Sequence, residues 1–299
     1  MLMDMTGCNL CPRACNVDRT RVRGYCGSNE IVRVSRASLH MWEEPCISGE
    51  EGSGTVFFSG CPLHCVYCQN RDISHGNVGR ELTIDELSDV FIRLGNRGAN
   101  NINLVTPTHY IPQIREAIIK AKKNGLNIPI VYNTGGYECV ESLKRLNGLI
   151  DVYMPDCKYY SKEMAFRYSN APDYYELTIK AIHEMYEQVG DASFNQKGIM
   201  TKGVIVRHLL LPDGLEDSKK IIKALYNEFG DSIYFSIMNQ YTPMNGIEKL
   251  YPELGRKVSE KEYDELVDYA ISIGIENGFV QEGDTALESF IPDFDTWEE

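Results

Sequence analysis

Three cysteines lie close together directly after a short apolar run at residues 55–58. Cys61, Cys65 and Cys68 have the spacing C-x3-C-x2-C. Three neighbouring thiolates can hold three corners of a metal cluster and leave the fourth open, as a catalytic zinc site keeps one position free. Iron–sulfur clusters are normally held by four thiolates. The run therefore predicts a metal centre with an open corner, which indicates an enzyme.

The composition is that of an acidic globular chain. Its 299 residues suffice for one large α/β domain or two ordinary ones, and 43% of them are hydrophobic. No run approaches the ~20 apolar residues that span a bilayer, and the first residues lack a signal-peptide pattern. A formal charge of −13 argues against general nucleic-acid binding, which depends on neutralising phosphates. We therefore expect a cytoplasmic protein that binds neither a membrane nor a nucleic acid.

The cysteines are concentrated near the N-terminus, where eight of the ten fall within the first 68 residues. Without an export signal, such thiols suit metal binding better than disulfides. Cys8, Cys11, Cys15 and Cys26 have the spacing C-x2-C-x3-C-x10-C and can close a second, tetrahedral site. Two interpretations stay open for this set: a structural zinc that folds the segment, and an auxiliary iron–sulfur cluster.

Residues 1–50 and 51–299 differ in pattern, and we expect a boundary between them. The first part is rich in cysteine and in glycine and proline breakers, which predicts a loop-rich, metal-binding extension. In the second part, short apolar runs alternate with stretches whose apolar residues recur at three- and four-residue spacing. The expected strands lie at 55–58, 101–105, 129–133, 152–154, 204–211, 234–238 and 279–281. The expected helices lie at 84–94, 112–123, 138–145, 173–189, 216–229 and 259–277.

Strands that alternate with helices indicate βαβ units and a parallel sheet. About six units fit here, whereas a full eight-unit barrel usually takes ~250 residues. The sequence therefore predicts the α/β class and a partial (β/α)6 barrel. Ligands bind such sheets at the carboxyl ends of the strands, which is where the cysteine loop falls.

Two interpretations compete for the cysteine loop. One is a zinc site that borrows a distant ligand such as Cys46 or His64, although zinc knuckles are usually paired C-x2-C units. The other is a [4Fe–4S] cluster with one open iron. A C-x3-C-x2-C loop after the first strand of a partial barrel resembles the signature of radical S-adenosylmethionine (radical SAM) enzymes.

The resemblance extends to the pyruvate formate-lyase activating enzyme branch. It rests on residues 60–70, on the N-terminal run Cys-x-Leu-Cys-Pro-Arg-x-Cys, and on Glu44-Pro45-Cys46-Ile47-Ser48-Gly49. These runs are similar to those of activating-enzyme homologues within that branch.

The chemistry that the resemblance implies starts at the open iron, which chelates the amino and carboxylate groups of S-adenosylmethionine. One electron from the reduced cluster cleaves the sulfonium and yields methionine and a 5′-deoxyadenosyl radical, which abstracts hydrogen from a substrate. The implied substrate is a protein or peptide, and a small molecule is the alternative. The implied electron donor is a flavodoxin or ferredoxin. An alternative of another class is a non-catalytic zinc or iron–sulfur module for electron transfer or interaction, which would lack a cofactor site.

Several site residues follow from the same resemblance. Tyr67 would lie near the adenine, unless it only packs against the cluster. Asp156 and Lys158 would lie at the active site, with Lys158 both catalytic and close to the cofactor; a mutual ion pair is the alternative. Arg207 and His208 interrupt an apolar strand and should point to opposite faces. The resemblance gives Arg207 the cofactor's carboxylate, whose geometry an arginine fork matches, and leaves His208 in the core.

One departure concerns the amino group of the cofactor. The usual Gly-Gly-Glu run after the second strand is absent, which leaves open whether the protein activates a glycyl radical enzyme. Thr106 and Thr108 stand in its place and are candidate hydroxyl contacts. Thr134, beside two glycines after the third strand, and Gln240, after the sixth, are further candidate cofactor contacts. A plain turn is the alternative for both.

Overall fold

The computed structural model describes residues 5–75 and 78–281. Its strands are β1 (Val32–His40), β2 (Ser53–Phe58), β3 (Arg80–Leu82), β4 (Ile102–Val105), β5 (Ile130–Thr134), β6 (Val152–Pro155), β7 (Ser193–Phe194), β8 (Met200–Leu209), β9 (Tyr234–Met238) and β10 (Gly278–Val280). Its α-helices are α1 (Pro45–Ser48), α2 (Arg71–Ser74), α3 (Ile84–Asn96), α4 (Ile111–Lys123), α5 (Val140–Leu143), α6 (Lys162–Ser169), α7 (Tyr174–Val189), α8 (Leu215–Phe229) and α9 (Glu260–Ser272). The 3-10 turns are η1 (Thr108–Tyr110), η2 (Lys144–Leu146), η3 (Gly230–Ser232), η4 (Ile247–Lys249) and η5 (Pro252–Gly255).

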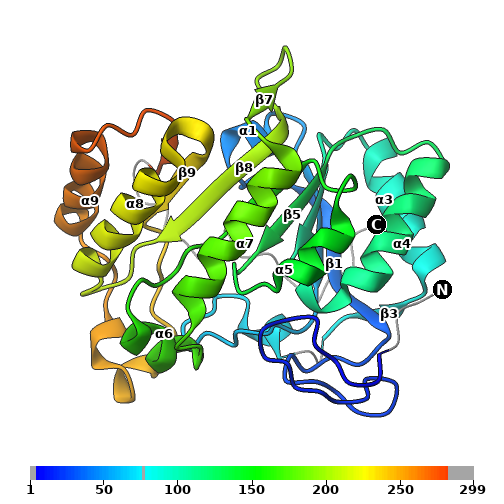
Figure 1. The fold of residues 1–299 in the computed structure, drawn as a ribbon, viewed down its shortest axis with the longest axis horizontal. Helices are drawn as coiled ribbons and strands as arrows, with labels where there is room; N and C mark the ends of the chain where they lie inside the picture. The colour runs from blue at the N-terminus through cyan, green and yellow to red at the C-terminus, as the bar shows by residue number, and fades with distance from the viewer. Residues whose placement is uncertain (1–4, 76–77, 282–299) are drawn as a thin grey trace.

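The strands form one sheet in the order β10-β9-β8-β6-β5-β4-β2-β1-β3, and β7 pairs with β8 off this path. Each neighbouring pair from β2 to β10 along the path is parallel, whereas β1 is antiparallel to β2 and β3. Helices α3, α4, α5, α7 and α8 lie along the outside of this curved sheet (Figure 1). The expected partial (β/α)6 barrel is therefore confirmed. No helix in the described residues has the length and apolar character needed to cross a membrane.

The two faces of the sheet bury different clusters, because successive side chains of a strand point to opposite sides. On β5, Tyr132 packs in the outer core beneath the helices, while Val131 joins an inner cluster. The inner cluster also contains Cys46 and Ile47 of α1. Since β1 runs antiparallel to β2, the chain enters α1 from the amino ends of the parallel strands, and α1 closes the barrel at that end.

The main helices begin and end where local chemistry favours it. Thr83 caps α3: its hydroxyl accepts a hydrogen bond from the N–H of Glu86, and the Glu86 carboxylate accepts one from the N–H of Thr83. Ser259 and Glu262 form the same reciprocal pair at the start of α9. Such capping boxes satisfy backbone donors that a helix start leaves without partners.

Strand structure begins earlier than the sequence pattern indicated. β1 lies within the stretch 1–50, and pairs with β2 in a register that sets Ser38 opposite Thr55. Basic residues at 33 and 36 lie among buried Val34 and Ala37, and the register shifts between Val34 and Arg36, so the strand lacks the strict alternation that would reveal it in the sequence. In the described residues, only 5–31 form a long segment with neither helix nor strand.

Two helical predictions also need correction. The expected helix at 138–145 is shorter, since it consists of α5 followed by the 3-10 turn η2. The helix expected at 173–189 is present as α7, but α6 precedes it and was not predicted.

Glu138 ties the carboxyl ends of β4 and β5 together. Its side chain is buried and accepts hydrogen bonds from Thr108 Oγ1 at 2.5 Å, from Thr134 Oγ1, and from the Tyr132 hydroxyl at 3.4 Å. Burial raises the pKa of this carboxyl to about 7, because the three donors offset only part of the desolvation.

We predict that Glu138→Gln removes a pH dependence of stability. Below about pH 4.5 the carboxyl is protonated in both the folded and the unfolded chain. As pH rises toward 7 the unfolded chain ionises first, so the free energy of unfolding falls, by about 3 kcal/mol in total. Glutamine keeps an acceptor oxygen but cannot ionise, so the variant should lack this fall.

The measurement is urea unfolding between about pH 5 and pH 8, followed by circular dichroism. Glu141→Gln, at an exposed carboxylate on α5, should retain the parent's pH dependence. If the free energy of unfolding fell equally with rising pH in the parent and in Glu138→Gln, the argument that burial raises the pKa of Glu138 would be contradicted.

Candidate functional site

The three-cysteine loop lies at the carboxyl end of β2, between β2 and α2. Gly60 opens it with φ +92°, and a Cβ atom there would lie 2.6 Å from the carbonyl oxygen of Cys26. Only glycine fits both the left-handed backbone and this close approach. The backbone after β2 is therefore built to turn sharply against the N-terminal segment.

The thiols of this loop influence one another. Burial raises the pKa of Cys61 to about 12, and the Cys65 and Cys68 thiols add to the effect. Burial raises the pKa of Cys68 to about 11, with Cys65 again contributing, while Lys158 opposes the rise. A positive charge therefore lies close to the same sulfurs.

Each of the three sulfurs also accepts a hydrogen bond. The pairs are Leu63 N–H to Cys61 Sγ at 3.4 Å, the Ser169 hydroxyl to Cys65 Sγ at 3.0 Å, and Asn70 N–H to Cys68 Sγ. Such donors favour the thiolate form that binds metal. A set made only of sulfur suits zinc or an iron–sulfur cluster.

A cavity of about 420 Å³ opens beside Cys65 and Cys68. This volume lies in the range of small-molecule and cofactor sites, ~300–1,000 Å³. One rim comes from the end of β1 and the chain between β1 and α1, and includes His40 and Trp42. Another part comes from β9 and the chain after β9 and β10, and includes Met238, Gln240 and Gln281. The cavity therefore lies between the two open sides of the partial barrel.

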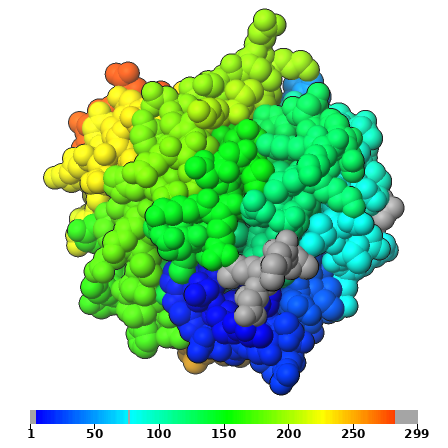
Figure 2. All heavy atoms as spheres, turned by 45° about the vertical axis from the view of Figure 1, so that its right-hand side comes forward, coloured from blue at the N-terminus to red at the C-terminus, as the bar shows by residue number. Residues whose placement is uncertain are grey.

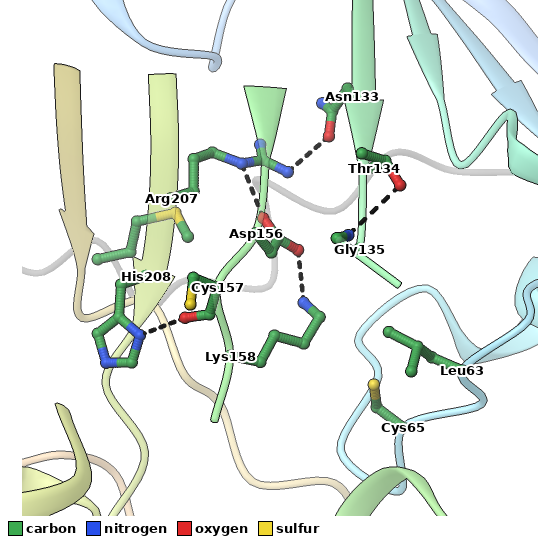
Figure 3. Close-up of polar contacts among 12 residues, drawn as sticks. Leu63, Cys65, Asn133, Thr134, Gly135, Asp156, Cys157, Lys158, Arg207 and His208 are labelled. Atoms are coloured by element: carbon green, nitrogen blue, oxygen red, sulfur yellow. Dashed lines mark hydrogen bonds and ion pairs between the residues drawn. The ribbon is translucent and has the colours of Figure 1, made fainter. Parts of the chain in front are cut away.

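A chain of charged groups crosses this cavity (Figure 3). Asp156 Oδ2 lies 2.5 Å from Lys158 Nζ, and Asp156 Oδ1 lies 3.0 Å from Arg207 Nε. The guanidinium of Arg207 also donates to the Glu43 carboxylate at 3.3 Å and to Asn133 Oδ1 at 2.6 Å. One carboxylate thus links a cation on β8 to a cation from the chain after β6.

The ionisation of these groups follows from their pairing. Burial alone would raise the pKa of Asp156, but Lys158 and Arg207 outweigh it and lower that pKa. Burial alone would lower the pKa of Lys158, but Asp156 outweighs it and raises that pKa. For Glu43 burial dominates and raises the pKa, despite the nearby Arg207. Asp156, Lys158 and Arg207 are therefore fixed charges at neutral pH.

The structure brings Asp156, Lys158 and Arg207 together at the cavity, and the ion pair considered as an alternative is present. Asp156, Glu43 and Asn133 take one donor each of Arg207. Lys158 has three donors, and one of them meets Asp156. Two of the three N–H donors of Lys158 therefore remain to meet the carboxylate of a ligand.

His208 points away from the cavity, as the period of the strand predicts. Its Nδ1 lies 2.7 Å from the carbonyl oxygen of Cys157, and its Nε2 lies 2.8 Å from Ser218 Oγ. The side chain is buried, and both ring nitrogens have partners.

The three predicted threonine contacts lie elsewhere. Thr108 and Thr134 donate their hydroxyl protons to Glu138, and neither lines the cavity. Thr106 does not line it either, and adopts φ +57° at the end of β4. This left-handed conformation is rare for a β-branched residue. The second glycine after Thr134 serves packing, since a Cβ on Gly136 would lie 2.1 Å from the carbonyl oxygen of Asp156.

Tyr67 and Gln240 both line the cavity. The Tyr67 ring also packs edge-on against Tyr159, Tyr168 and Tyr241, and its hydroxyl accepts a hydrogen bond from Tyr159 at 2.7 Å. Tyr67 thus contributes to both the cavity wall and an aromatic cluster. The backbone oxygen of Gln240 accepts a hydrogen bond from Gln69 Nε2 at 2.7 Å, which links β9 to the cysteine loop.

Sequence reasoning missed Glu43 and Asn133, which line the cavity, and Asn103, which donates to Glu43 at 2.9 Å. Asn103 carried a usable signal, because it is the single polar residue inside the apolar strand β4 and must point to something polar, whereas Asn133 lies at the end of β5 beside Thr134. Glu43 carried no such signal, since it lies in the irregular stretch before α1.

The four N-terminal cysteines lie in one small region, with Cys15 partly exposed and the other three buried. Within 5–75 and 78–281, no three cysteine, histidine or acidic side chains converge on the position of a single metal ion. This holds both for the four N-terminal cysteines and for Cys61, Cys65 and Cys68. Of the zinc partners considered for the loop, Cys46 packs in the inner cluster, whereas His64 stacks on Tyr25 and His75 and its Nε2 is buried without a hydrogen-bond partner.

The chain is similar to a family model and to known proteins. The model of the radical SAM superfamily matches residues 55–200. An uncharacterised protein of Methanocaldococcus jannaschii is 29% identical over 272 residues, which cover 88% of this chain and 74% of that protein. The pyruvate formate-lyase-activating enzyme of Staphylococcus aureus is 22% identical over 178 residues, which cover 56% of this chain and 65% of that enzyme.

Solved structures share the fold. Streptococcus suis SuiB bound to S-adenosylmethionine has a TM-score of 0.52 and 14% identity, with 74% of this chain and 48% of SuiB covered. HydG, a maturase of the [FeFe]-hydrogenase, has a TM-score of 0.52 and 18% identity, with 74% of this chain and 49% of HydG covered. The chain thus spans about half the length of these two proteins. The segment 55–200, which matches the radical SAM superfamily, contains the cysteine loop and most of the parallel strands.

Proposed function

We propose that the protein is a radical SAM enzyme that abstracts a hydrogen atom from a peptide or protein substrate. The family implies a [4Fe–4S] cluster and S-adenosylmethionine, which together supply a 5′-deoxyadenosyl radical when one electron enters. The observation that carries the proposal is the position of the three thiols, beside a cofactor-sized cavity that contains Lys158. The reductant that we propose is a flavodoxin or ferredoxin.

The chain's own residues divide the work. Cys61, Cys65 and Cys68 hold the cluster, and the three donors to their sulfurs keep the thiolates in place. Lys158 meets the carboxylate of the cofactor, because its ammonium group lines the cavity and lies close enough to Cys65 for its charge to be felt there. Asp156 holds Lys158 in position, and Arg207 holds Asp156. Tyr67 forms the wall against which an adenine ring can pack.

The substrate class follows from the shape of the site and from relatives. The cavity opens between two sides of the sheet, and Trp42 on its rim is 63% exposed. An exposed aromatic beside an open cavity suits contact with a larger partner. SuiB, which shares the fold with a TM-score of 0.51, has been solved with its precursor peptide. The similarity to the pyruvate formate-lyase-activating enzyme, whose name refers to a protein target, also favours a protein substrate.

The first prediction concerns the loop. Cys65→Ala should abolish release of 5′-deoxyadenosine and methionine from S-adenosylmethionine, because a cluster held at only two corners is not retained. Cys139→Ala removes a thiol outside both sets and should leave product release at the parental level. The assay uses anaerobically reconstituted protein, a one-electron reductant and chromatographic product analysis. Unchanged cleavage in Cys65→Ala would refute the proposed function.

The second prediction concerns Lys158. Lys158→Met keeps the apolar stem and removes the charged donors, so binding of S-adenosylmethionine should weaken by roughly 10- to 150-fold, the value of a charged hydrogen bond. The dissociation constant is measured anaerobically, and the iron content confirms that the cluster is retained. Lys162→Met, at an exposed position that pairs with Glu176, should bind like the parent. Equal affinities for all three proteins would remove Lys158 from the site.

The third prediction concerns the substrate. Cell extract from a culture grown in deuterated medium is divided by ultrafiltration into macromolecules and small molecules. If the substrate is a protein or peptide, deuterium should appear in 5′-deoxyadenosine when the macromolecular fraction is added, and protease treatment should remove the effect. Transfer from the small-molecule fraction alone would contradict a protein or peptide substrate.

A further inference from the structure

The N-terminal segment 5–31 has little apolar material to hold it together. It contains no helix or strand in its described residues, and its own buried cluster consists of Met5, Cys8 and Leu10 with Cys15 and Val17 beside them. A segment this short rarely folds on such a core without a disulfide, a metal or another cross-link. Its cysteines are free thiols.

Two of the four thiols of this segment lie beside Gly24, and the other two lie close to one of them. The sulfurs of Cys15 and Cys26 lie 3.4 and 3.5 Å from the point where a Cβ atom on Gly24 would be. Cys11 is close enough to Cys8 and Cys26 for their charges to interact, and Cys26 is similarly close to Cys8. Four residues that are spread over nineteen positions of sequence thus lie near one another.

Backbone donors approach these sulfurs as they do in the radical SAM loop. In each case the N–H of the residue two positions after a cysteine donates to its sulfur. The pairs are Arg13 to Cys11 and Ser28 to Cys26 in the segment, and Leu63 to Cys61 and Asn70 to Cys68 in the loop. Hydrogen bonds to thiolate sulfur belong to the outer shell of metal centres.

The side chain of Arg19 indicates that a negative charge belongs near these thiols. Its side chain is fully buried, and its Nε has no hydrogen-bond partner. Its Nη1 donates to the carbonyl oxygen of His109 at 2.5 Å and lies 3.9 Å from the sulfur of Cys8. Among the described residues no carboxylate pairs with it. A buried cation without a counter-charge is costly, whereas a set of thiolates would supply the charge.

The segment is also bonded to the radical SAM loop. The N–H of Cys61 donates to the carbonyl oxygen of Cys26 at 3.1 Å. The guanidinium of Arg13 donates to Pro62 O at 2.8 Å and to Ser169 O at 2.7 Å. The N-terminal segment packs against the barrel at one end of the molecule (Figure 2). The first cysteine of the loop therefore touches the last cysteine of the N-terminal set.

We propose that Cys8, Cys11, Cys15 and Cys26 bind a second metal centre as four thiolates, with Arg19 as its counter-charge. The chemistry is that of a zinc ion or an iron–sulfur cluster, both of which keep a net negative charge when four thiolates hold them. The four sulfurs would move toward one another to bind a zinc ion, or would stay farther apart around the larger iron–sulfur cluster. The centre braces the loop that carries Cys61, and only this last point rests on the proposed function.

The test separates this centre from the loop. The variant Cys61→Ala/Cys65→Ala/Cys68→Ala is prepared anaerobically, once with zinc and once with iron and sulfide, and metal per chain is counted by mass spectrometry. About one zinc or about four irons should remain bound, and the arm that retains metal identifies the centre. Adding Cys15→Ala, at the least buried of the four, should lower the count at least tenfold. Adding Cys46→Ala, at a thiol that packs in the inner cluster, should not change it.

Absence of bound metal from both preparations would overturn the proposal, as would a count that survives Cys15→Ala. A second measurement does not remove a ligand: Arg19→Gln keeps all four thiols but should release metal to a chelator about tenfold faster, and Arg19→Lys should restore part of the difference. Release at the parental rate from Arg19→Gln would refute its role as counter-charge. None of these outcomes depends on cofactor cleavage, which is assayed separately on the parent chain.

Discussion

The carboxylate of Asp156 is the contact on which the interior of the barrel depends. It follows β6, near the middle of the sheet, and its two oxygens meet cations from separate elements. Its backbone is held as firmly, since its N–H donates to Thr134 O at 2.8 Å and its carbonyl oxygen accepts from the Tyr174 hydroxyl at 2.9 Å. Without this carboxylate, Arg207 would keep only Glu43 and Lys158 would be a buried cation with no carboxylate beside it, and an uncompensated buried charge costs about 3–5 kcal/mol. The charge pattern of the cavity is therefore set before any ligand arrives.

The sequence predicted the elements that obey a strict period. The strands at 101–105, 129–133 and 234–238 match β4, β5 and β9 closely, because a short apolar run between two amphipathic helices is usually a buried strand. The opposite orientations of Arg207 and His208 followed from the alternation of side chains along a strand. β1 escaped notice because its basic residues and the cysteines before it resemble a loop. Its partner β2 lies across a turn that contains α1, so its pairing has no local signature.

The site was less predictable, because its geometry comes from contacts between distant segments. Thr108 and Thr134 were expected at the cofactor, yet both satisfy Glu138, a buried carboxyl from the chain after β5. Polar residues at strand ends compete for ligands and for one another, and sequence spacing does not show which partner wins. Glu43 is the reverse case, since it enters the cavity from the closed end of the barrel. The cysteine loop was predictable because its chemistry is local.

The cavity draws its rim from two places that are far apart in the chain. His40 and Trp42 precede the three-cysteine loop, whereas Gln240 and Gln281 come after every strand that carries the charged groups. Either rim can therefore diverge by mutation while the segment between them, which holds the thiols and the ion pairs, stays unchanged. A protein built this way can acquire a new substrate without rebuilding the part that starts the reaction. Its two sheet edges are the places where evolutionary change would meet the least resistance.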